Sequence, residues 1–261
     1  MTDLTPGDVD AMSVQKPFAA PGAPPPVVDA NDSIGGRLRD LVMHPGRLMA
    51  RVGARPLWWV PGLVVLVVVA AFSWLTSPIS GPEQMEMMRH SKLMSMMPEE
   101  QWQQQYDAAM NLSAAKRIFQ AVTGGLMAWI MMLVFGFVLG FFVRMSGGKG
   151  TMRQALGITA WAGLLPFALG PIVKLPLVLT TESVFHVNIG LAALMPNAEP
   201  GSPLFQVLMS YGDFLTWWGL AVMVIGFAEV FGLTRKAAVT SVVLPWALLS
   251  LIPLGVSLIF M

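Results

Sequence analysis

The sequence contains no cysteine, and charged residues make up only 12% of it. Without cysteine the chain forms no disulfide, holds no thiolate-bound metal and has no cysteine nucleophile. The charged fraction is well below the roughly 25% of an average soluble domain. The formal net charge is +1, which gives no sign of the clustered basic face that nucleic-acid binding requires. These absences indicate a membrane protein without a nucleic-acid partner.

What the chain does contain is long apolar runs, and its mean hydropathy is +0.63. Each run has about the 20 residues that a helix needs to cross a hydrocarbon core of roughly 30 Å. No apolar segment of a signal peptide precedes the first run, so we expect that run to target the chain itself. The sequence therefore predicts an all-α membrane protein with five transmembrane helices. The predicted spans are residues 57–77, 121–143, 155–179, 214–233 and 239–260.

The orientation follows from the lysine and arginine residues that flank these spans, because cytoplasmic loops carry the excess of positive charge. Most of them lie in the N-terminal segment, the second loop and the fourth loop, and fewer lie in the first loop. We therefore expect a multi-pass protein of the plasma (inner) membrane, with the N-terminus cytoplasmic and Met261 on the opposite side. The first group is Lys16, Arg37, Arg39, Arg47, Arg51, Arg55, Arg144, Lys149, Arg153, Arg235 and Lys236, and the second is Arg89, Lys92, Lys116 and Arg117.

Two regions precede the first span. Residues 1–31 are rich in proline and predict a disordered cytoplasmic tail, whereas residues 32–261 form one membrane domain. Asp32 or Ser33 can cap an amphipathic, basic helix that Pro45 interrupts. Such a helix lies along an anionic leaflet, either as a plain anchor or as a docking site for a specific lipid or partner. Its apolar positions are Ile34, Leu38, Leu41, Val42, Leu48, Met49 and Val52.

The first loop, residues 78–120, is expected to be helical from Glu83 onward and to face away from the cytoplasm. Met87, His90, Met94 and Met97 are spaced by three, four and three residues, so they share one helical face. Thioether and imidazole groups are ligands that suit Cu(I). Methionine is equally an adaptable apolar filler, so the same face suits helix packing.

The second and third spans contain residues that shape helices. Gly136 and Gly140 have the small-xxx-small spacing that lets two helices approach closely. Pro166, Pro171 and Pro176 recur every five residues and each removes a backbone hydrogen bond, which predicts a kinked third span. Broken helices near the membrane midplane mark substrate sites in some transporters. Proline is also common in membrane helices that have no such site. After this span we expect a helix at the outer surface over residues 184–195, which include His186.

Two ionisable residues lie within the spans, near opposite interfaces. Lys174 is close enough to the outer end of its helix to extend its ammonium group into the headgroups. Glu229 has a short side chain, and a charge that faces lipid is costly. We therefore expect Glu229 to face the bundle, towards Arg153, Arg235 or Lys236. These two residues are the intramembrane polar candidates.

The motifs of common catalytic sites are missing. His44, His90 and His186 do not form a His-Glu-x-x-His zinc site. The segment 148–151 lacks the first glycine and the hydroxyl residue of a phosphate-binding loop, and no Gly-x-Ser-x-Gly sequence is present. We expect no catalytic residues, no cofactor and no enzymatic activity.

Three segments resemble the Yip family of Ypt/Rab-interacting multi-pass membrane proteins, and in particular its bacterial branch. They are residues 44–58, which lead into the first span, residues 147–166 and residues 217–238. The Gly-Tyr pair of eukaryotic members is replaced here by Ala160-Trp161, and the Asp-Leu-Tyr-Gly-Pro motif is missing. The resemblance implies five spans with a cytoplasmic N-terminus and no catalytic residues.

The sequence therefore favours a membrane-organising or trafficking-type scaffold that acts through helix packing, the lipid bilayer and protein partners or a second copy of itself. The alternative is a transporter of a small solute or a metal such as copper. It would use the proline-broken third span, Glu229 and the outer face of Met87, His90, Met94 and Met97.

Overall fold

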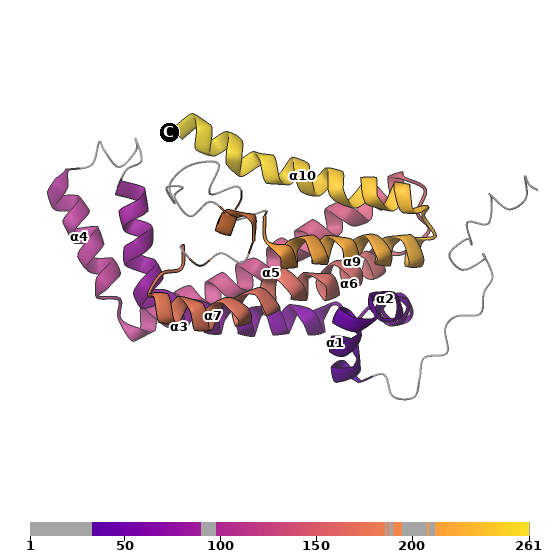
Figure 1. The fold of residues 1–261 in the computed structure, drawn as a ribbon, viewed down its shortest axis with the longest axis horizontal. Helices are drawn as coiled ribbons and strands as arrows, with labels where there is room; N and C mark the ends of the chain where they lie inside the picture. The colour runs from indigo at the N-terminus through magenta and orange to yellow at the C-terminus, as the bar shows by residue number, and fades with distance from the viewer. Residues whose placement is uncertain are drawn as a thin grey trace, which may run out of the picture.

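The structure is a computed structural model that describes residues 33–89, 98–185, 187, 190–194, 208 and 212–260, with backbone only for residues 87, 88, 250 and 252–260. The regular elements in these ranges are helices, with an isolated antiparallel bridge between Gly190 and Asp213. Figure 1 shows the long helices running side by side along the longest axis of the molecule. The prediction of an all-helical protein is confirmed for the described residues.

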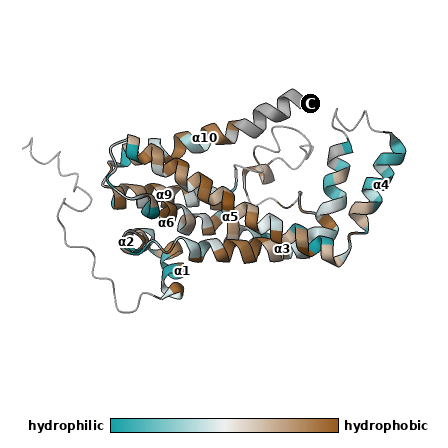
Figure 2. Ribbon diagram, turned by 180° about the vertical axis from the view of Figure 1, so that it is seen from behind, coloured by the Kyte–Doolittle hydropathy of each residue, from teal (hydrophilic) through white to brown (hydrophobic). Residues whose placement is uncertain are grey.

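Four helical stretches are long and apolar enough to cross a membrane, and they coincide with the first four predicted spans. Figure 2 shows the hydrophobic colour along these helices, while α4, Glu99–Met110, is mostly hydrophilic. A further long helix, α10, occupies Arg235–Phe260, where the sequence predicts the fifth span. The four stretches are Trp59–Glu86 in α3, Ala114–Met145 (α5), Met152–Thr181 (α6, η3 and α7) and Phe214–Phe231 (α9).

Helix α3 extends over Trp59–Arg89, well beyond the predicted end of the first span at residue 77. The sequence predicts that the first loop begins at Pro78, where the apolar run ends. Proline lacks the N–H that would bond the carbonyl of Trp74. Two side chains replace that donor, since Arg117 Nη2 of α5 and Ser77 Oγ each donate to the Trp74 oxygen at 3.0 Å. The helix therefore continues through Pro78 and packs beside α4 at its C-terminal end (Figure 1).

The third stretch is not one regular α-helix. Helix α6, Met152–Leu164, is followed by a π-helical turn, η3, over Leu165–Leu169, and then by α7, Gly170–Thr181. Pro166 lies within the π turn, Pro171 lies in the first turn of α7 and Pro176 lies inside α7. A proline leaves the fourth preceding carbonyl without its helical donor, and a π turn is one way in which a helix adapts.

The long helices approach closely at glycines. On Gly136 a Cβ would lie 3.2 Å from the Thr159 Cβ of α6, and on Gly140 a Cβ would lie 2.8 Å from Ala155 Cβ. The small-xxx-small pair therefore faces α6 of the same chain. On Gly125 a Cβ would lie 2.5 Å from the Leu66 oxygen of α3.

Two turns define what we call the basic end of the bundle: residues 146–151 between α5 and α6, and residues 232–234 between α9 and α10. Gly232 ends α9 in the left-handed conformation, with a φ of 67°. At the opposite end, which we call the far end, α4 and the C-terminal end of α7 are found (Figure 1). The predicted outer helix over residues 184–195 is represented in the described residues by one short 3-10 turn, η4, Leu191–Leu194.

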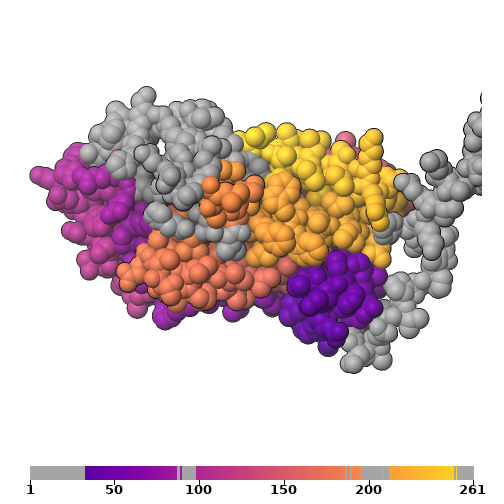
Figure 3. Space-filling view, viewed as in Figure 1, coloured from indigo at the N-terminus to yellow at the C-terminus, as the bar shows by residue number. Residues whose placement is uncertain are grey.

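The segment before the first span forms two short helices at the basic end. Helix α1 covers Ile34–Met43 and helix α2 covers Pro45–Ala54, with the break at His44 where the sequence predicts an interruption by Pro45. Ser33 is the N-cap of α1 and its hydroxyl accepts a hydrogen bond from Gly36 N at 3.1 Å. Figure 3 shows both helices as one block against α9. The predicted proline-rich tail, residues 1–31, lies outside the described residues.

Candidate functional site

At the basic end, α2 packs between α6 and α9, and we call this packing site the seat of α2. Leu48, Met49 and Val52 of α2 are fully buried, so this helix is not exposed along its apolar face. Its closest neighbours are glycines: a Cβ on Gly226 of α9 would lie 2.7 Å from Met49 Sδ, and one on Gly157 of α6 would lie 3.0 Å from Val52 Cγ1. The sequence predicted an amphipathic surface helix here, whereas α2 is a packed part of the bundle.

The C-terminal end of α2 is held by Arg37 of α1. Its Nη1 donates to the carbonyl oxygen of Arg55, the C-cap residue of α2, at 2.9 Å. The guanidinium also lies 5.5 Å from the ring centroid of Trp161, which is completely buried. Arg37 itself is only 1% exposed. A cation here complements the partial negative charge of a helix C-terminus.

The N-terminal end of α2 meets Glu229 of α9. A Cβ on Gly46, in the first turn of α2, would lie 3.7 Å from Glu229 Oε2. This oxygen is buried and has no hydrogen-bond partner among the described residues. The expected pairing with Arg153, Arg235 or Lys236 is therefore not made by this oxygen. The first turn of a helix carries partial positive charge, which favours a carboxylate beside it.

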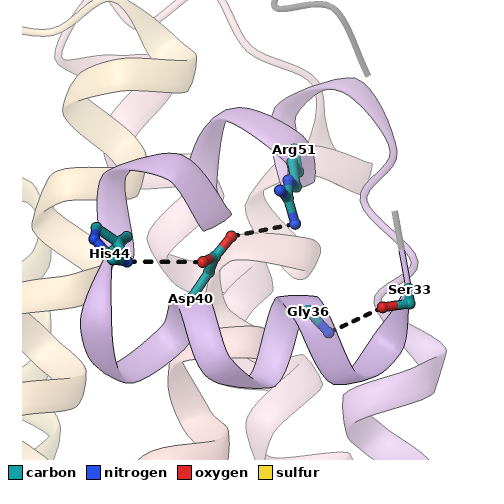
Figure 4. Close-up of polar contacts among 5 residues, drawn as sticks. All are labelled: Ser33, Gly36, Asp40, His44 and Arg51. Atoms are coloured by element: carbon teal, nitrogen blue, oxygen red, sulfur yellow. Dashed lines mark hydrogen bonds and ion pairs between the residues drawn. The ribbon is translucent and has the colours of Figure 1, made fainter. Parts of the chain in front are cut away.

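Helices α1 and α2 are also joined to each other through Asp40, which is 5% exposed. Figure 4 shows its carboxylate between two basic side chains. Arg51 Nη1 of α2 lies 3.2 Å from Asp40 Oδ2, and His44 Nδ1 lies 3.8 Å from Asp40 Oδ1. The face of α1 that contacts α2 is therefore charged. Its Asp40 carboxylate lies beside His44 at the start of α2 and beside Arg51 near the end of α2.

Helix α6 is fixed to α2 where it begins. Thr151 and Gln154 form a reciprocal capping box, in which each side chain accepts from the other residue's backbone N–H. The side-chain nitrogen of Gln154, Nε2, additionally donates to the backbone oxygen of Gly53 in α2 at 2.8 Å. The segment 148–151, which superficially resembles a phosphate loop, packs instead on Phe231, from which a Cβ on Gly150 would be 2.7 Å away.

Lys174 lies at the far end and forms an ion pair with a carboxylate of the protein. Its Nζ is 3.0 Å from Asp213 Oδ2, and the two side chains are 24% and 11% exposed. Asp213 is also the N-cap of α9, and its Oδ1 accepts from Leu215 N at 2.8 Å. Asp213 was not singled out from the sequence, although an aspartate directly before an apolar run is a helix-start signal.

Glu83 is a second carboxylate at the far end, and its partner was not predicted from the sequence. It accepts a hydrogen bond from Ser183 Oγ and another, at 2.8 Å, from Val184 N. The contact ties the outer part of α3 to the residues that follow α7. No local sequence pattern links residues a hundred positions apart, so this contact had no signal in the sequence.

The copper hypothesis concerns residues that the structure does not describe. His90, Met94 and Met97 lie outside the described ranges, and only the backbone of Met87 is described. In the part of the chain that is described, no group of three or more His, Cys, Asp and Glu side chains could hold a metal ion.

The geometry is thus a bundle of apolar helices whose basic end is organised around α2. No curated protein and no solved structure matches the chain. The family model of the Yip1 domain matches residues 39–256, which include α2, all four apolar stretches and most of α10. This match covers most of the chain and includes the three segments that resemble the family, and the protein therefore belongs to the Yip1 domain family.

Proposed function

We propose that the protein is a non-enzymatic, membrane-organising scaffold that acts through helix packing, lipid contact and protein partners. The observation that carries the proposal is the position of the two intramembrane ionisable residues within the helix packing. Lys174 pairs with Asp213, and Glu229 lies against the first turn of α2. A transporter needs ionisable groups that are available to a substrate or a coupling ion. Here Lys174 instead joins α7 to the start of α9, and the Glu229 Oε2 atom is buried beside α2 without a hydrogen-bond partner among the described residues.

The proline-broken third stretch supports the same function. On Gly219 of α9 a Cβ would lie 3.3 Å from the Ala162 oxygen, which accepts from Leu165 N because Pro166 has no N–H to donate, and 3.3 Å from Pro166 Cδ. Helix α9 therefore packs directly onto the broken turn. In transporters, irregular backbone at membrane depth lines a cavity, whereas here a neighbouring helix covers it.

The proposed topology has five spans in the plasma (inner) membrane, with α10 as the fifth, the basic end cytoplasmic and Met261 on the opposite side. The distribution of lysine and arginine among the loops supports this orientation. Reporter fusions test it: a tag before Met1 should be cytoplasmic and one after Met261 should not. Both tags on one side would rule out an odd number of spans.

The scaffold and the transporter differ in solute flux. The purified chain in proteoliposomes should not accelerate proton or Cu(I) uptake down an imposed gradient beyond the rate of protein-free vesicles. It should instead change vesicle size in proportion to the protein-to-lipid ratio, as seen by electron cryomicroscopy. Gradient-driven uptake that disappears in Glu229→Gln, with the variant still folded, would establish the transporter and overturn the scaffold.

A further inference from the structure

Helix α1 has an inverted pattern of burial. Its charged residues Arg37 and Asp40 are 1% and 5% exposed, whereas Ile34, Leu38 and Val42 are 51%, 41% and 48% exposed. These three aliphatic residues follow each other at intervals of four, so successive positions are only about 40° apart around the helix. They form one continuous strip, which we call the α1 strip, on the side away from the Arg37 and Asp40 contacts.

The position of α1 indicates what covers this strip. Figure 1 shows α1 projecting sideways from the bundle, across the direction of the apolar helices rather than along it. Helix α2 ends at Ala54 and α3 begins at Trp59, so α1 is joined to the first apolar helix through α2 and a short connection. If the apolar helices cross a membrane, α1 lies in the plane of that membrane, near one of its surfaces.

Charge at the basic end selects the kind of surface. The exposed basic residues there come from α1, from α2 and its C-cap, from the turn 146–151 and from the helix ends that adjoin the two turns. They are Arg39, Arg47, Arg55, Arg144, Lys149, Arg153, Arg235 and Lys236. Among the described residues of this end, the carboxylates of Asp40 and Glu229 face inward against α2. Exposed Lys and Arg side chains are attracted to an anionic lipid surface.

We propose that α1 is an in-plane lipid anchor: the α1 strip inserts among the acyl chains of an anionic leaflet, and Arg39 and its basic neighbours contact the headgroups. The inference rests on the proposed placement of the chain in a membrane, and it adds the lipid class and the residues that bind it. The Asp40 and Arg37 contacts hold the helix so that its apolar side turns outward. An inserted interfacial helix lies about 5–10 Å into the headgroup and acyl boundary.

The absence of cysteine allows a direct test. Single-cysteine variants Leu38→Cys and Val42→Cys, labelled with a fluorophore, are reconstituted as the full chain in vesicles with about 30% phosphatidylglycerol. Spin-labelled lipid should quench both labels strongly, and aqueous iodide should quench them weakly. The matched control is Arg39→Cys on the same helix, where we expect the reverse preference. Lipid quenching at positions 38 and 42 that is no stronger than at position 39 and weak at all three would overturn the proposal, because it would mean that acyl chains do not reach the strip.

Two further measurements separate the parts of the proposal. In vesicles of neutral phosphatidylcholine, lipid quenching at position 42 should fall roughly threefold, and unchanged quenching would overturn the requirement for anionic lipid. Adding Leu38→Asp to the Val42→Cys chain should abolish lipid quenching while the thermal unfolding temperature stays close to that of the parent, because residue 38 is exposed. Retained quenching would also overturn the anchor.

These readouts do not depend on the scaffold function. A chain that transports solute but shows lipid quenching at positions 38 and 42 would refute the proposed function and leave the anchor in place. A chain without solute flux whose labels at positions 38 and 42 are not quenched by lipid would refute the anchor and leave the proposed function in place.

Discussion

Arg37 and Glu229 lie at opposite ends of the same helix, α2: Arg37 donates to the C-cap carbonyl, and Glu229 Oε2 lies beside the first turn. One residue precedes the first apolar helix and the other lies near the end of the fourth. A helix of ten residues is marginal on its own, so its stability depends on such tertiary contacts. Each charge at a helix terminus contributes about 0.3–1 kcal/mol, and up to about 2 kcal/mol where it is partly buried.

Substitutions at Glu229 test this arrangement. Glu229→Gln keeps the shape and should lower the free energy of unfolding by about 1 kcal/mol, whereas Glu229→Lys places a cation at the helix N-terminus and should cost more than about 2 kcal/mol. Unfolding of the purified variants in detergent measures both. If the Lys variant is as stable as the Gln variant, the first turn of α2 does not sense this charge.

Two adjacent glycines of α5 provide a matched test of helix approach. A Cβ on Gly125 would be 2.5 Å from the Leu66 oxygen, whereas a Cβ on Gly124 would have no neighbour within 4 Å. Gly125→Ala should destabilise the bundle by about 1–3 kcal/mol because α3 must move. Gly124→Ala should be neutral or stabilising by up to about 1 kcal/mol. Equal unfolding temperatures for the two variants would contradict the close contact of α3 with α5.

The pair of Lys174 and Asp213 should show measurable coupling. Asp213→Asn keeps a good N-cap for α9 and removes the ion pair, so it should cost about 1 kcal/mol, and Asp213→Ala should cost roughly another 1 kcal/mol. Lys174→Met should cost little once Asp213→Asn is present. A double-mutant cycle of unfolding free energies checks this, and additive effects would show that the pair does not interact.

Arg117 should matter more than its neighbour Lys116, which is exposed. Arg117→Gln removes the donors to the Trp74 oxygen and to Ser77 Oγ, and should destabilise the far end by about 1–3 kcal/mol. Hydrogen exchange should then rise in α3 around Pro78. Lys116→Gln is the control and should leave exchange unchanged. The same exchange pattern in both variants would mean that α3 continues through Pro78 without the Arg117 donor to the Trp74 oxygen.

The sequence was a good guide to features that depend on local composition. Apolar length located the four stretches, and Pro45 marked the break between α1 and α2. Ser33, one of two residues proposed as a cap, is the N-cap of α1. Each of these follows from a short run of residues and the helix geometry that it favours.

Features that depend on distant partners could not be obtained in this way. The first loop was predicted to begin at residue 78, where the apolar run ends. Nothing near that position in the sequence shows that Arg117, about forty residues on, donates to the Trp74 oxygen. Arg37 counted only as one of many cytoplasmic charges, although it is buried against Trp161. The same reasoning treated α2 as a surface helix, because an apolar face that meets lipid and one that meets α9 have the same periodicity.

The seat of α2 also has a consequence for biosynthesis. Helix α2 is made early, but its walls come from α6 and from α9, and the latter ends at Phe231. At about 5–20 residues per second, ribosomes need roughly 10–40 s to produce the chain between them. During that interval the complete packing site of α2 does not yet exist. The bilayer surface or a chaperone must then cover the apolar residues Leu48, Met49 and Val52. Truncated nascent chains that end before α9 should therefore leave α2 open to protease, and chains that extend past α9 should protect it.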